Sequence, residues 1–496
     1  MPQVDCLVVG AGSAGAVMTA RLSEDPTRTV LLLEAGPDHS SAETPAEIAG
    51  ANFFAIWALP DRVWPGLSAV RAEGQRPSLY RRGRGAGGSS AVNAMAAIRG
   101  MPEDYDRWAK ELGCPGWDSA AMLAAFLAVE DDHDYGGDGQ HGKGGPLPLT
   151  RVPPELSSPI DTALRSAITE LGYPVCDSYH AAGATGLSRV AFNISDGRRV
   201  STNDAYLEPA RSRPNLQIRG DVLVDRVALD GNRAVGVITA DGEEIRARET
   251  IIAAGAIHSP AILLRSGIGT DGRLPVGANL IDHPTINLPL RLDPQARATS
   301  SELRIVQSML RYSSGLADAG TNDMQLVWMS PIGVDDASQL GALLIGAAMQ
   351  VFSRGEVRLQ SLDPRIDPIV EFRMLSDERD LIRMRDALRR AWSVIGHSAV
   401  TAVAESMFSS TGSPDALPTD DAIDAWLMQN VHDYVHAAGT CRMGSVGDPA
   451  AVVDTQCRVI GFDALRVCDA SVIPDIPRAN THLTTVAIAE RVAALF

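Results

Sequence analysis

The stretch from Asp5 to Glu34 constrains the fold more than any other part of the chain. An apolar run, Cys6 to Val9, ends at the turn Gly10-Ala11-Gly12-Ser13-Ala14-Gly15, and an alanine-rich segment follows. A second apolar run, Val30 to Leu33, ends at Glu34. A strand, a glycine-rich turn, a helix and a second strand in this order predict a βαβ unit of the Rossmann type.

The glycines and the acid of this unit predict a dinucleotide ligand. Gly10 allows the tight turn, Gly12 lets the backbone approach a pyrophosphate, and Gly15 lets the helix pack close to the strand. Glu34 lies about 20 residues further on, where a carboxylate accepts hydrogen bonds from a ribose diol and repels a 2′-phosphate. The ligand is therefore expected to be FAD or NAD rather than NADP. The alternative for Glu34 is a solvated acid at the end of a strand.

Length, charge and cysteine usage limit the function classes. A chain of 496 residues exceeds one ordinary core, so two closely joined domains are expected. A formal net charge of −17 argues against binding to nucleic acid or to an anionic membrane. No apolar run approaches the ~18 residues of a membrane span. The six cysteines show no CxxC pair, and the first strand follows Met1 within a few residues, which together predict a cytoplasmic protein.

A second glycine-rich segment, Tyr80 to Asn93, is expected to form another wall of the ligand site. Its glycines permit close backbone approach, and its serines, asparagine and N–H groups donate hydrogen bonds to anions. A flexible surface linker would explain the glycines but not the apolar residues 94–98 that follow.

These segments and several later ones resemble the glucose–methanol–choline (GMC) flavin oxidoreductases. The loop with residues 99–108 is similar to the family's first signature region, and residues 255–269 are similar to the second. Residues 276–284, 436–444 and 467–471 are similar to the family's later motifs. The motifs span nearly the whole chain in family order. The C-terminal pattern is most similar to the hydroxymethylfurfural oxidase and choline dehydrogenase branch.

The resemblance implies an α/β protein (α+β overall) with two domains, a Rossmann-like FAD-binding domain and a substrate-binding domain with a mainly antiparallel sheet flanked by helices. The middle of the chain agrees with this. Its alternating pattern predicts a hairpin around Leu229-Asp230-Gly231-Asn232, a buried strand at 250–254, strands within 323–329 and 341–352, and a helix at 377–395. The FAD-binding domain is expected to comprise residues 1–36, 76–150, 196–288 and 431–496, and the substrate-binding domain residues 37–75, 151–195 and 289–430.

The resemblance also implies an activity, the oxidation of a primary alcohol to the aldehyde by proton abstraction and hydride transfer to flavin N5. His436 stands at the position of the family's catalytic histidine, and Asn480 at that of its second catalytic residue. Imidazole accepts a proton near neutral pH and an amide does not, so His436 is the expected base. Asn480 or Thr481 alternatively caps a helix over residues 482–494, whose N-terminus would favour the negative charge that builds up on flavin reduction.

The same motifs imply the residues that contact FAD. They are Gly10, Gly12, Ser13, Gly15, Glu34, Ala35, Arg84, Gly88, Ser89, Asn93, Ala94, Val224, Asp469, Ala470, Asn480, Thr481 and His482. Some relatives bond FAD covalently through a histidine directly before the loop asparagine. Val92 stands there in this chain, so noncovalent FAD is expected.

No metal is expected. His432 and His436 have helical spacing but no third ligand at zinc-like distance. The acidic run at 130–134 lacks the alternating ligands of a calcium loop, so a solvated turn is expected there.

The substrate class and the electron acceptor stay open. Val435 replaces a bulky aromatic residue of relatives, which favours an aromatic or heteroaromatic alcohol, with O2 or another acceptor reoxidising the flavin. The alternatives are a choline- or polyol-type dehydrogenase with a quinone-like acceptor, and a hydroxynitrile-lyase-like enzyme in which flavin is structural. A plain NAD-binding reductase would leave the second glycine-rich loop and the C-terminal motifs unexplained.

Overall fold

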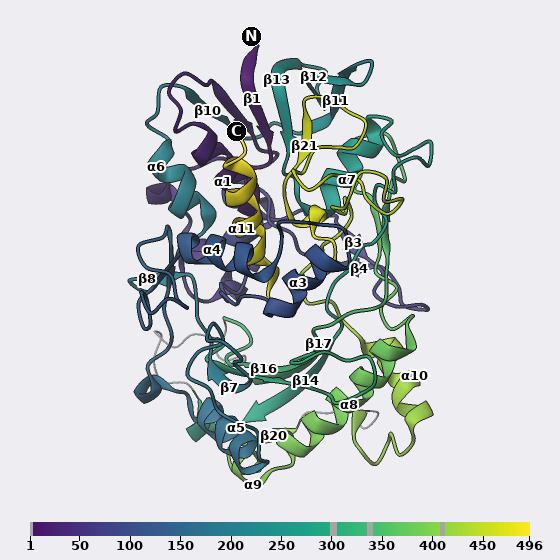
Figure 1. Cartoon of the computed structure of the whole chain (residues 1–496). Coiled ribbons are helices and arrows are strands. Elements are labelled where there is room, and N and C mark those ends of the chain that lie inside the picture. Colours follow the sequence, from purple (N-terminus) through teal and green to yellow (C-terminus); the bar gives the residue numbers. More distant parts are fainter. Residues whose placement is uncertain (1–2, 298–304, 335–340, 407–411) are drawn as a thin grey trace.

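The predicted βαβ unit lies at the centre of a seven-stranded sheet in the upper half of Figure 1. The structure is a computed structural model that describes residues 3–297, 305–334, 341–406 and 412–496. Strand β1 (Val4–Val9) pairs in parallel with β2 (Val30–Leu33) and β13 (Glu244–Ile252), and helix α1 (Ser13–Leu22) connects the first two. The apolar runs become strands because their side chains are buried, including Cys6 in β1.

Later segments of the chain complete this sheet. Its order is β10-β2-β1-β13-β12-β11, and β21 also pairs with β13. The predicted hairpin is present as two antiparallel strands with Gly231 and Asn232 in the turn. The bounds are β10 (Leu216–Arg219), β11 (Val224–Asp230), β12 (Arg233–Thr239) and β21 (Leu465–Val467).

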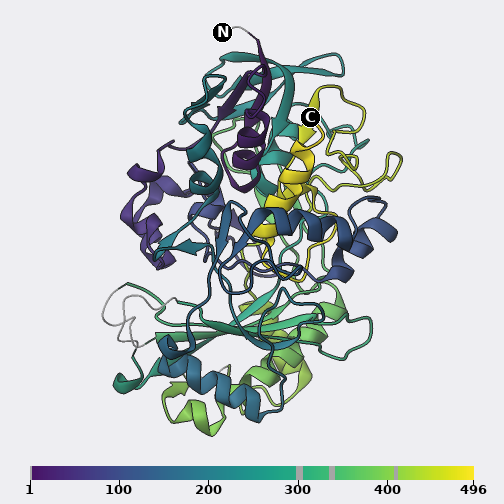
Figure 2. The same cartoon turned by 60° about the vertical axis from the view of Figure 1, so that its left-hand side comes forward.

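The C-terminal helix packs against the first helix. Helix α11 (Thr481–Ala493) lies beside α1, and the two views in Figures 1 and 2 agree on this. It begins one residue before the predicted range. Helix α7 (Gly255–Arg265) follows β13 and contacts the edge strand β11. Helix α11, near the C-terminus, therefore packs against α1, near the N-terminus.

The second sheet is antiparallel and lies in the lower half of both views. Its order is β20-β14-β17-β16-β15-β7. Helix α8 (Glu378–Ile395) covers its central strands, and α5 (Pro159–Glu170) packs on its other end, so this sheet is flanked by helices as predicted. The strands are β7 (Gly186–Arg189), β14 (Thr285–Leu292), β15 (Ser308–Tyr312), β16 (Met324–Met329), β17 (Gly341–Ala348) and β20 (Ala404–Ser406).

Shorter elements join the two sheets. The helices are α2 (Ala46–Ala49), α3 (Pro102–Lys110), α4 (Ser119–Val129), α6 (Glu208–Ala210), α9 (Ser398–Thr401) and α10 (Asp420–Asn430). The strands form short pairs: β3 (Ser68–Ala69) with β4 (Ser78–Leu79), β5 (Glu130–Asp132) with β6 (Leu147–Leu149), β8 (Ile194–Ser195) with β9 (Arg198–Arg199), and β18 (Glu356–Arg358) with β19 (Ile369–Glu371).

The acidic run is a solvated turn only at its end, where His133 and Asp134 are exposed, so the prediction is wrong for its first part. Glu130 and Asp132 are fully buried in β5. Arg99 pairs with Glu130, and Arg151 pairs with Asp132 at 2.8 Å. A carboxylate is tolerated in the interior when such a partner balances the cost of removing it from water.

The predicted division into two domains stays a prediction. Strand β14 runs across the boundary expected between residues 288 and 289, and the three internal segments outside the description all fall within the predicted range 289–430. Within the described ranges, no helix combines the length and the apolar character that crossing a membrane requires.

Candidate active site

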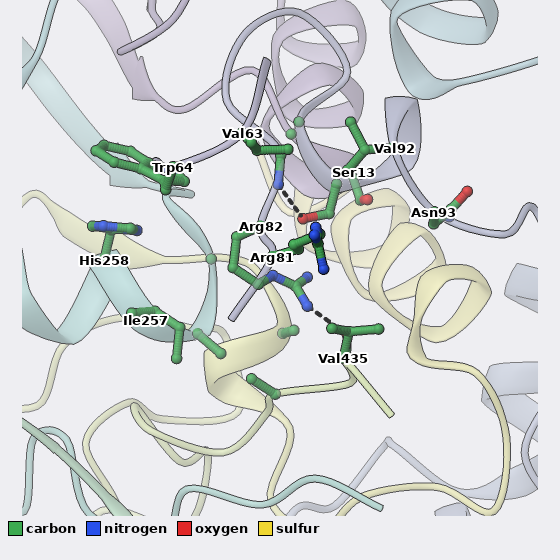
Figure 3. A pocket seen from close by; sticks show the side chains of 18 of the residues that line it. Ser13, Val63, Trp64, Arg81, Arg82, Val92, Asn93, Ile257, His258 and Val435 are labelled. Carbon is green, nitrogen blue, oxygen red and sulfur yellow. Dashed lines mark hydrogen bonds between the residues drawn. The ribbon is translucent and has the colours of Figure 1, made fainter. Parts of the chain in front are cut away.

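A cavity of about 560 Å³ lies at the carboxyl ends of β1, β2 and β13. It is lined by the glycine-rich turn after β1, by the second glycine-rich loop and by the first residues of α11. Asn287 of β14 and Met329 of β16 line it from the antiparallel sheet. Figure 3 shows Ser13 of the first turn and Arg81, Arg82, Val92 and Asn93 of the second loop around the cavity. Ligand sites in open parallel sheets typically lie at this edge.

The two glycine-rich loops meet backbone to backbone. Gly10 has a φ of +103°, and a Cβ atom on Gly15 would lie 1.8 Å from the carbonyl oxygen of Gly10. A Cβ atom on Gly88 would lie 2.6 Å from the Cα atom of Gly12. Side chains are therefore excluded from this junction, which lets a pyrophosphate approach the N-terminus of α1 closely.

The carboxylate of Glu34 ties these loops together. One oxygen accepts from the N–H of Ala11 at 2.7 Å, and the other accepts from Gly36 at 2.9 Å and Gly85 at 2.8 Å. Burial raises the pKa of Glu34, and the three N–H donors oppose that rise. The solvated alternative is wrong. A carboxylate offers about four lone-pair sites, so one of them stays available for a ligand hydroxyl.

Most of the residues expected to bind FAD line this one cavity. Gly15 and Arg84 do not, because Gly15 lies behind the turn and Arg84 donates to the carbonyl oxygen of Ala35 at 2.8 Å. Asp469 lines the cavity but accepts from the N–H of Gly255 at the start of α7. The others along its wall are Gly10, Gly12, Ser13, Glu34, Ala35, Gly88, Ser89, Asn93, Ala94, Val224, Ala470, Asn480, Thr481 and His482.

His436 and Asn480 come together in the cavity wall. Nδ2 of Asn480 lies 3.2 Å from Nε2 of His436. Asn480 precedes α11, yet its side chain makes no capping hydrogen bond, so the capping role expected as an alternative is wrong for Asn480. Its Oδ1 is buried and has no hydrogen-bond partner in the structure. The residue therefore presents an unused acceptor beside a histidine.

His482, two residues further on, lies on another side of the cavity. Its Nδ1 is 3.1 Å from the hydroxyl oxygen of Ser13, in the turn that follows β1. Burial, with a smaller contribution from Arg199, lowers the pKa of His482 to about 4.

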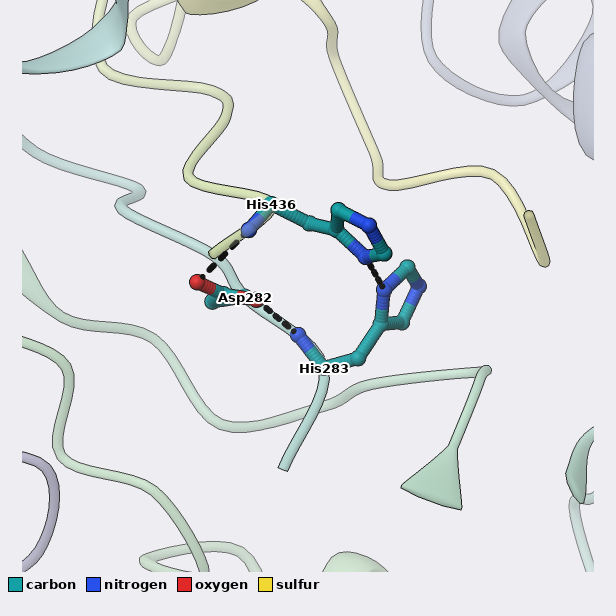
Figure 4. A group of neighbouring side chains, drawn as sticks. All are labelled: Asp282, His283 and His436. Atoms are coloured by element: carbon teal, nitrogen blue, oxygen red, sulfur yellow. Dashed lines mark hydrogen bonds between the residues drawn. The ribbon is translucent and has the colours of Figure 1, made fainter. Parts of the chain in front are cut away.

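Two residues of the site, Asp282 and His283, received no role from the sequence. Nδ1 of His283 lies 2.9 Å from Nδ1 of His436 (Figure 4). Nε2 of His283 lies 3.1 Å from the carbonyl oxygen of Pro477. The Asp282 carboxylate accepts from the backbone N–H of His436 at 2.9 Å. In the sequence they are a polar pair after the apolar residues 280–281, and only the fold reveals that both are buried beside His436.

Hydrogen bonds account for this cluster without a metal. Ligand atoms of Asp282, His283 and His436 lie within 4.8 Å of one another, a spacing compatible with an ion. However, each oxygen of Asp282 already accepts two hydrogen bonds, from the N–H groups of His283, Tyr434 and His436 and the hydroxyl of Tyr80. His432 is not helical and pairs its backbone with Thr285, so it does not form the helical histidine pair considered above.

Burial keeps both facing histidines neutral. It lowers the pKa of His436 well below the ordinary value of 6.5, and the neighbouring His283 and Arg82 lower it further. Burial also lowers the pKa of His283 to about 3. An unprotonated imidazole at His436 is the form that can accept a proton.

The mouth of the cavity combines apolar and cationic side chains. Trp57, Leu79 and Val435 are large hydrophobic residues that are exposed there. Arg81 lies over the Trp57 ring, 4.1 Å from its centroid, and Arg82 donates to the carbonyl oxygen of Val435 (Figure 3). Val435 adopts a φ of +55°, a conformation that is strained for a β-branched residue.

Comparison with known proteins places this site in a defined family context. Residues 4–285 and 351–489 match the two models of GMC oxidoreductases. The chain is 36% identical to the 5-(hydroxymethyl)furfural oxidase of Methylovorus sp. (strain MP688), over 99% of the chain and 98% of that protein. It is 34% identical to an oxygen-dependent choline dehydrogenase of Escherichia coli O17:K52:H18, over 99% and 95%. The crystal structure of pyridoxine 4-oxidase from Mesorbium loti aligns with a TM-score of 0.88 at 31% identity, over 100% and 99%.

Proposed function

Because the chain belongs to the GMC oxidoreductase family and is an FAD-dependent oxidoreductase of alcohols, we propose that it oxidises a primary aromatic or heteroaromatic alcohol to the aldehyde. The observation that carries this proposal is the contact between His436 and Asn480 in the cavity wall. The exposed Trp57, Leu79 and Val435 at the mouth support an aromatic ring as the substrate's body. Two relatives named above are oxidases of ring-bearing alcohols, according to their names.

The residues present fit FAD. The first turn of α1 offers backbone N–H groups for the pyrophosphate, and the free lone pair of Glu34 suits a ribose hydroxyl. When bound, FAD supplies the hydride acceptor. Val92 has no nucleophilic atom, which supports noncovalent attachment.

The alcohol is activated by two side chains. Its hydroxyl group donates to Nε2 of His436 and its oxygen accepts from Nδ2 of Asn480. The hydroxyl proton passes to Nε2 while the hydride leaves the α-carbon, so the carbon–oxygen bond becomes a carbonyl. Asn480 continues to hold the oxygen as its charge changes.

A quaternary ammonium substrate is disfavoured. Arg81 and Arg82 both line the cavity at its mouth. Two guanidinium groups repel a second cation in a partly desolvated site. The choline-type alternative is therefore the weaker one for this chain.

An alcohol panel tests the proposal. Benzyl alcohol, 5-(hydroxymethyl)furfural, choline and mandelonitrile are each added anaerobically while the flavin absorbance is followed. We expect rapid bleaching with the two ring-bearing primary alcohols. Cleavage of mandelonitrile with unchanged yellow colour would instead indicate the lyase, and bleaching by choline alone would indicate the choline-type dehydrogenase.

The electron acceptor is measured in a second set of assays. Peroxide release in air and reduction of an artificial quinone-like dye are scored for every alcohol that bleaches the flavin. Release of peroxide at the rate of alcohol oxidation would identify O2 as the electron acceptor. Reduction of the dye without release of peroxide would identify a quinone-like electron carrier.

A further inference from the structure

We propose that His283 is a positioning residue that fixes the tautomer of His436, so that Nε2 of His436 faces the substrate as a proton acceptor. The inference rests on the proposed function, in which His436 is the base. Its evidence is a chain of hydrogen bonds that begins at the carbonyl group of Pro477 and ends in the cavity.

The carbonyl group of Pro477 determines which atoms donate and which accept in this series of hydrogen bonds. A carbonyl oxygen can only accept, so Nε2 of His283, 3.1 Å away, carries the proton. A neutral imidazole has one N–H group, which leaves Nδ1 of His283 as an acceptor. Nδ1 of His436, 2.9 Å from it, must then donate (Figure 4). Nε2 of His436 is left with its lone pair.

The cavity end agrees with this assignment. Nδ2 of Asn480 can only donate, and it lies 3.2 Å from Nε2 of His436. The opposite tautomer would place two lone pairs 2.9 Å apart between the histidines. Because both rings are buried, such an unpaired contact is costly.

The backbone holds the two rings in this geometry. Asp282 accepts from the N–H of His283 at 2.8 Å and from the N–H of His436 at 2.9 Å. The ring planes are nearly perpendicular, at 88°, with centroids 5.2 Å apart. In this arrangement the two Nδ1 atoms lie 2.9 Å apart. His283 therefore acts through His436 and does not reach the substrate itself.

Because His283 is buried, it accepts a hydrogen bond from His436 and does not take up the substrate proton. The pKa of His283 is lowered to about 3, so its Nδ1 keeps a lone pair at neutral pH. When the substrate proton arrives at Nε2 of His436, the resulting cation donates from Nδ1 to His283. That hydrogen bond is charge-assisted, and it stabilises the cation while the substrate proton stays on His436.

A pair of variants separates positioning from packing. His283→Asn places an amide oxygen close to the position of Nδ1 and keeps an acceptor for His436, whereas His283→Leu has similar bulk and no acceptor. At saturating alcohol under anaerobic conditions, we expect His283→Leu to slow flavin reduction about 10–100-fold, the usual effect of removing a hydrogen-bond partner that orients a functional histidine. The KM and the FAD content should change little, and His283→Asn should recover most of the rate.

Two outcomes would overturn the proposal. One is wild-type reduction by His283→Leu with FAD fully bound. The other is an equal loss in both variants, which would assign His283 to packing alone. If neither variant folds, ¹⁵N chemical shifts of the histidine-labelled wild-type holoenzyme decide, with the His436 signal assigned by its loss in His436→Ala. A protonated Nε2 refutes the proposal. These outcomes differ from a failure of the proposed function. If His436 is not the base, His436→Ala would reduce its flavin at the wild-type rate, whatever the tautomer of His436 in the wild type.

Discussion

Nε2 of His436 and the amide nitrogen of Asn480 lie 3.2 Å apart, on segments separated by 44 residues. A hydroxyl group placed beside this pair meets a proton acceptor and a hydrogen-bond donor at once. The two roles differ in kind, because the imidazole changes its protonation state and the amide does not. Substitutions at the two positions should therefore slow flavin reduction by different factors.

His436→Ala should slow anaerobic flavin reduction by about 10²–10⁴-fold, the usual contribution of a general base. Asn480→Ala should cost about 0.5–1.5 kcal/mol, the contribution of one hydrogen bond. Stopped-flow absorbance measures both rates at equal flavin occupancy. His133→Ala, at a surface histidine beside Asp131, is the matched control and should behave as wild type. An unaffected His436→Ala variant would place the base elsewhere, and His482 would be tested next.

The rate of flavin reduction should be independent of pH across the neutral range and should fall only in acid. The reason is that burial lowers the pKa of His436 well below 6.5, so the imidazole is already neutral at pH 7 and becomes protonated only well below that value. A pH series of single-turnover rates measures this. A titration near pH 7 in the holoenzyme would contradict the lowered pKa.

Glu34→Ala should weaken the retention of FAD by more than a single ligand contact explains. The substitution removes three hydrogen bonds that join the two glycine-rich loops, each charge-assisted bond contributing about 1.5–3 kcal/mol. The flavin-to-protein absorbance ratio after dilution and gel filtration reports the loss. Glu244→Ala, at an exposed acid in β13, is the control. Equal occupancy in both variants would mean that Glu34 does not organise the site.

Acid precipitation should release all the flavin into the supernatant. Val92 stands where some relatives carry the histidine that bonds FAD, and an aliphatic side chain cannot form that bond. Absorbance of the supernatant and of the redissolved, washed pellet measures the split. Yellow colour that stays with the washed pellet would show a covalent link.

Val435→Gly should raise the free energy of unfolding by about 1 kcal/mol, because a left-handed conformation costs a residue with a Cβ atom about 1–2 kcal/mol. Val435 has a φ of +55° and is 44% exposed, so little buried contact is lost. Val446→Gly is the control: Val446 is 73% exposed and is not among the residues with positive φ, so glycine should destabilise there. Urea titrations compare the two. A loss of stability at both positions would show that Val435 is not strained.

Local patterns predicted the parts of the fold that depend on neighbours in the sequence. The βαβ unit, the hairpin of β11 and β12 and the helix α8 each followed from periodicity and turn residues. The burial of Glu130 did not, because its partner Arg99 lies 31 residues away and a run of acids reads locally as solvated. His283 was missed for the same reason, since its partners come from the C-terminal segments.

The predicted role of Glu34 was incomplete rather than wrong. A single motif predicts a ribose contact, yet it carries no information about a second loop. Gly85, which donates to the same carboxylate, lies 51 residues further along the chain. A sequence motif therefore identifies one binding partner of a polar side chain. A buried polar side chain also forms hydrogen bonds with distant residues, and the motif does not reveal these.

The return of the C-terminus to the first sheet has a consequence for synthesis on the ribosome. Strand β21 adds to β13, and helix α11 covers α1, although both are translated long after the elements that they contact. While β21 and α11 are still inside the exit tunnel, the nascent chain does not have Asn480 in place, and the flank of α1 is bare. The cofactor site is therefore completed only after β21 and α11 emerge, and a chain terminated before them has an uncovered apolar surface that makes it a substrate for chaperones or proteases.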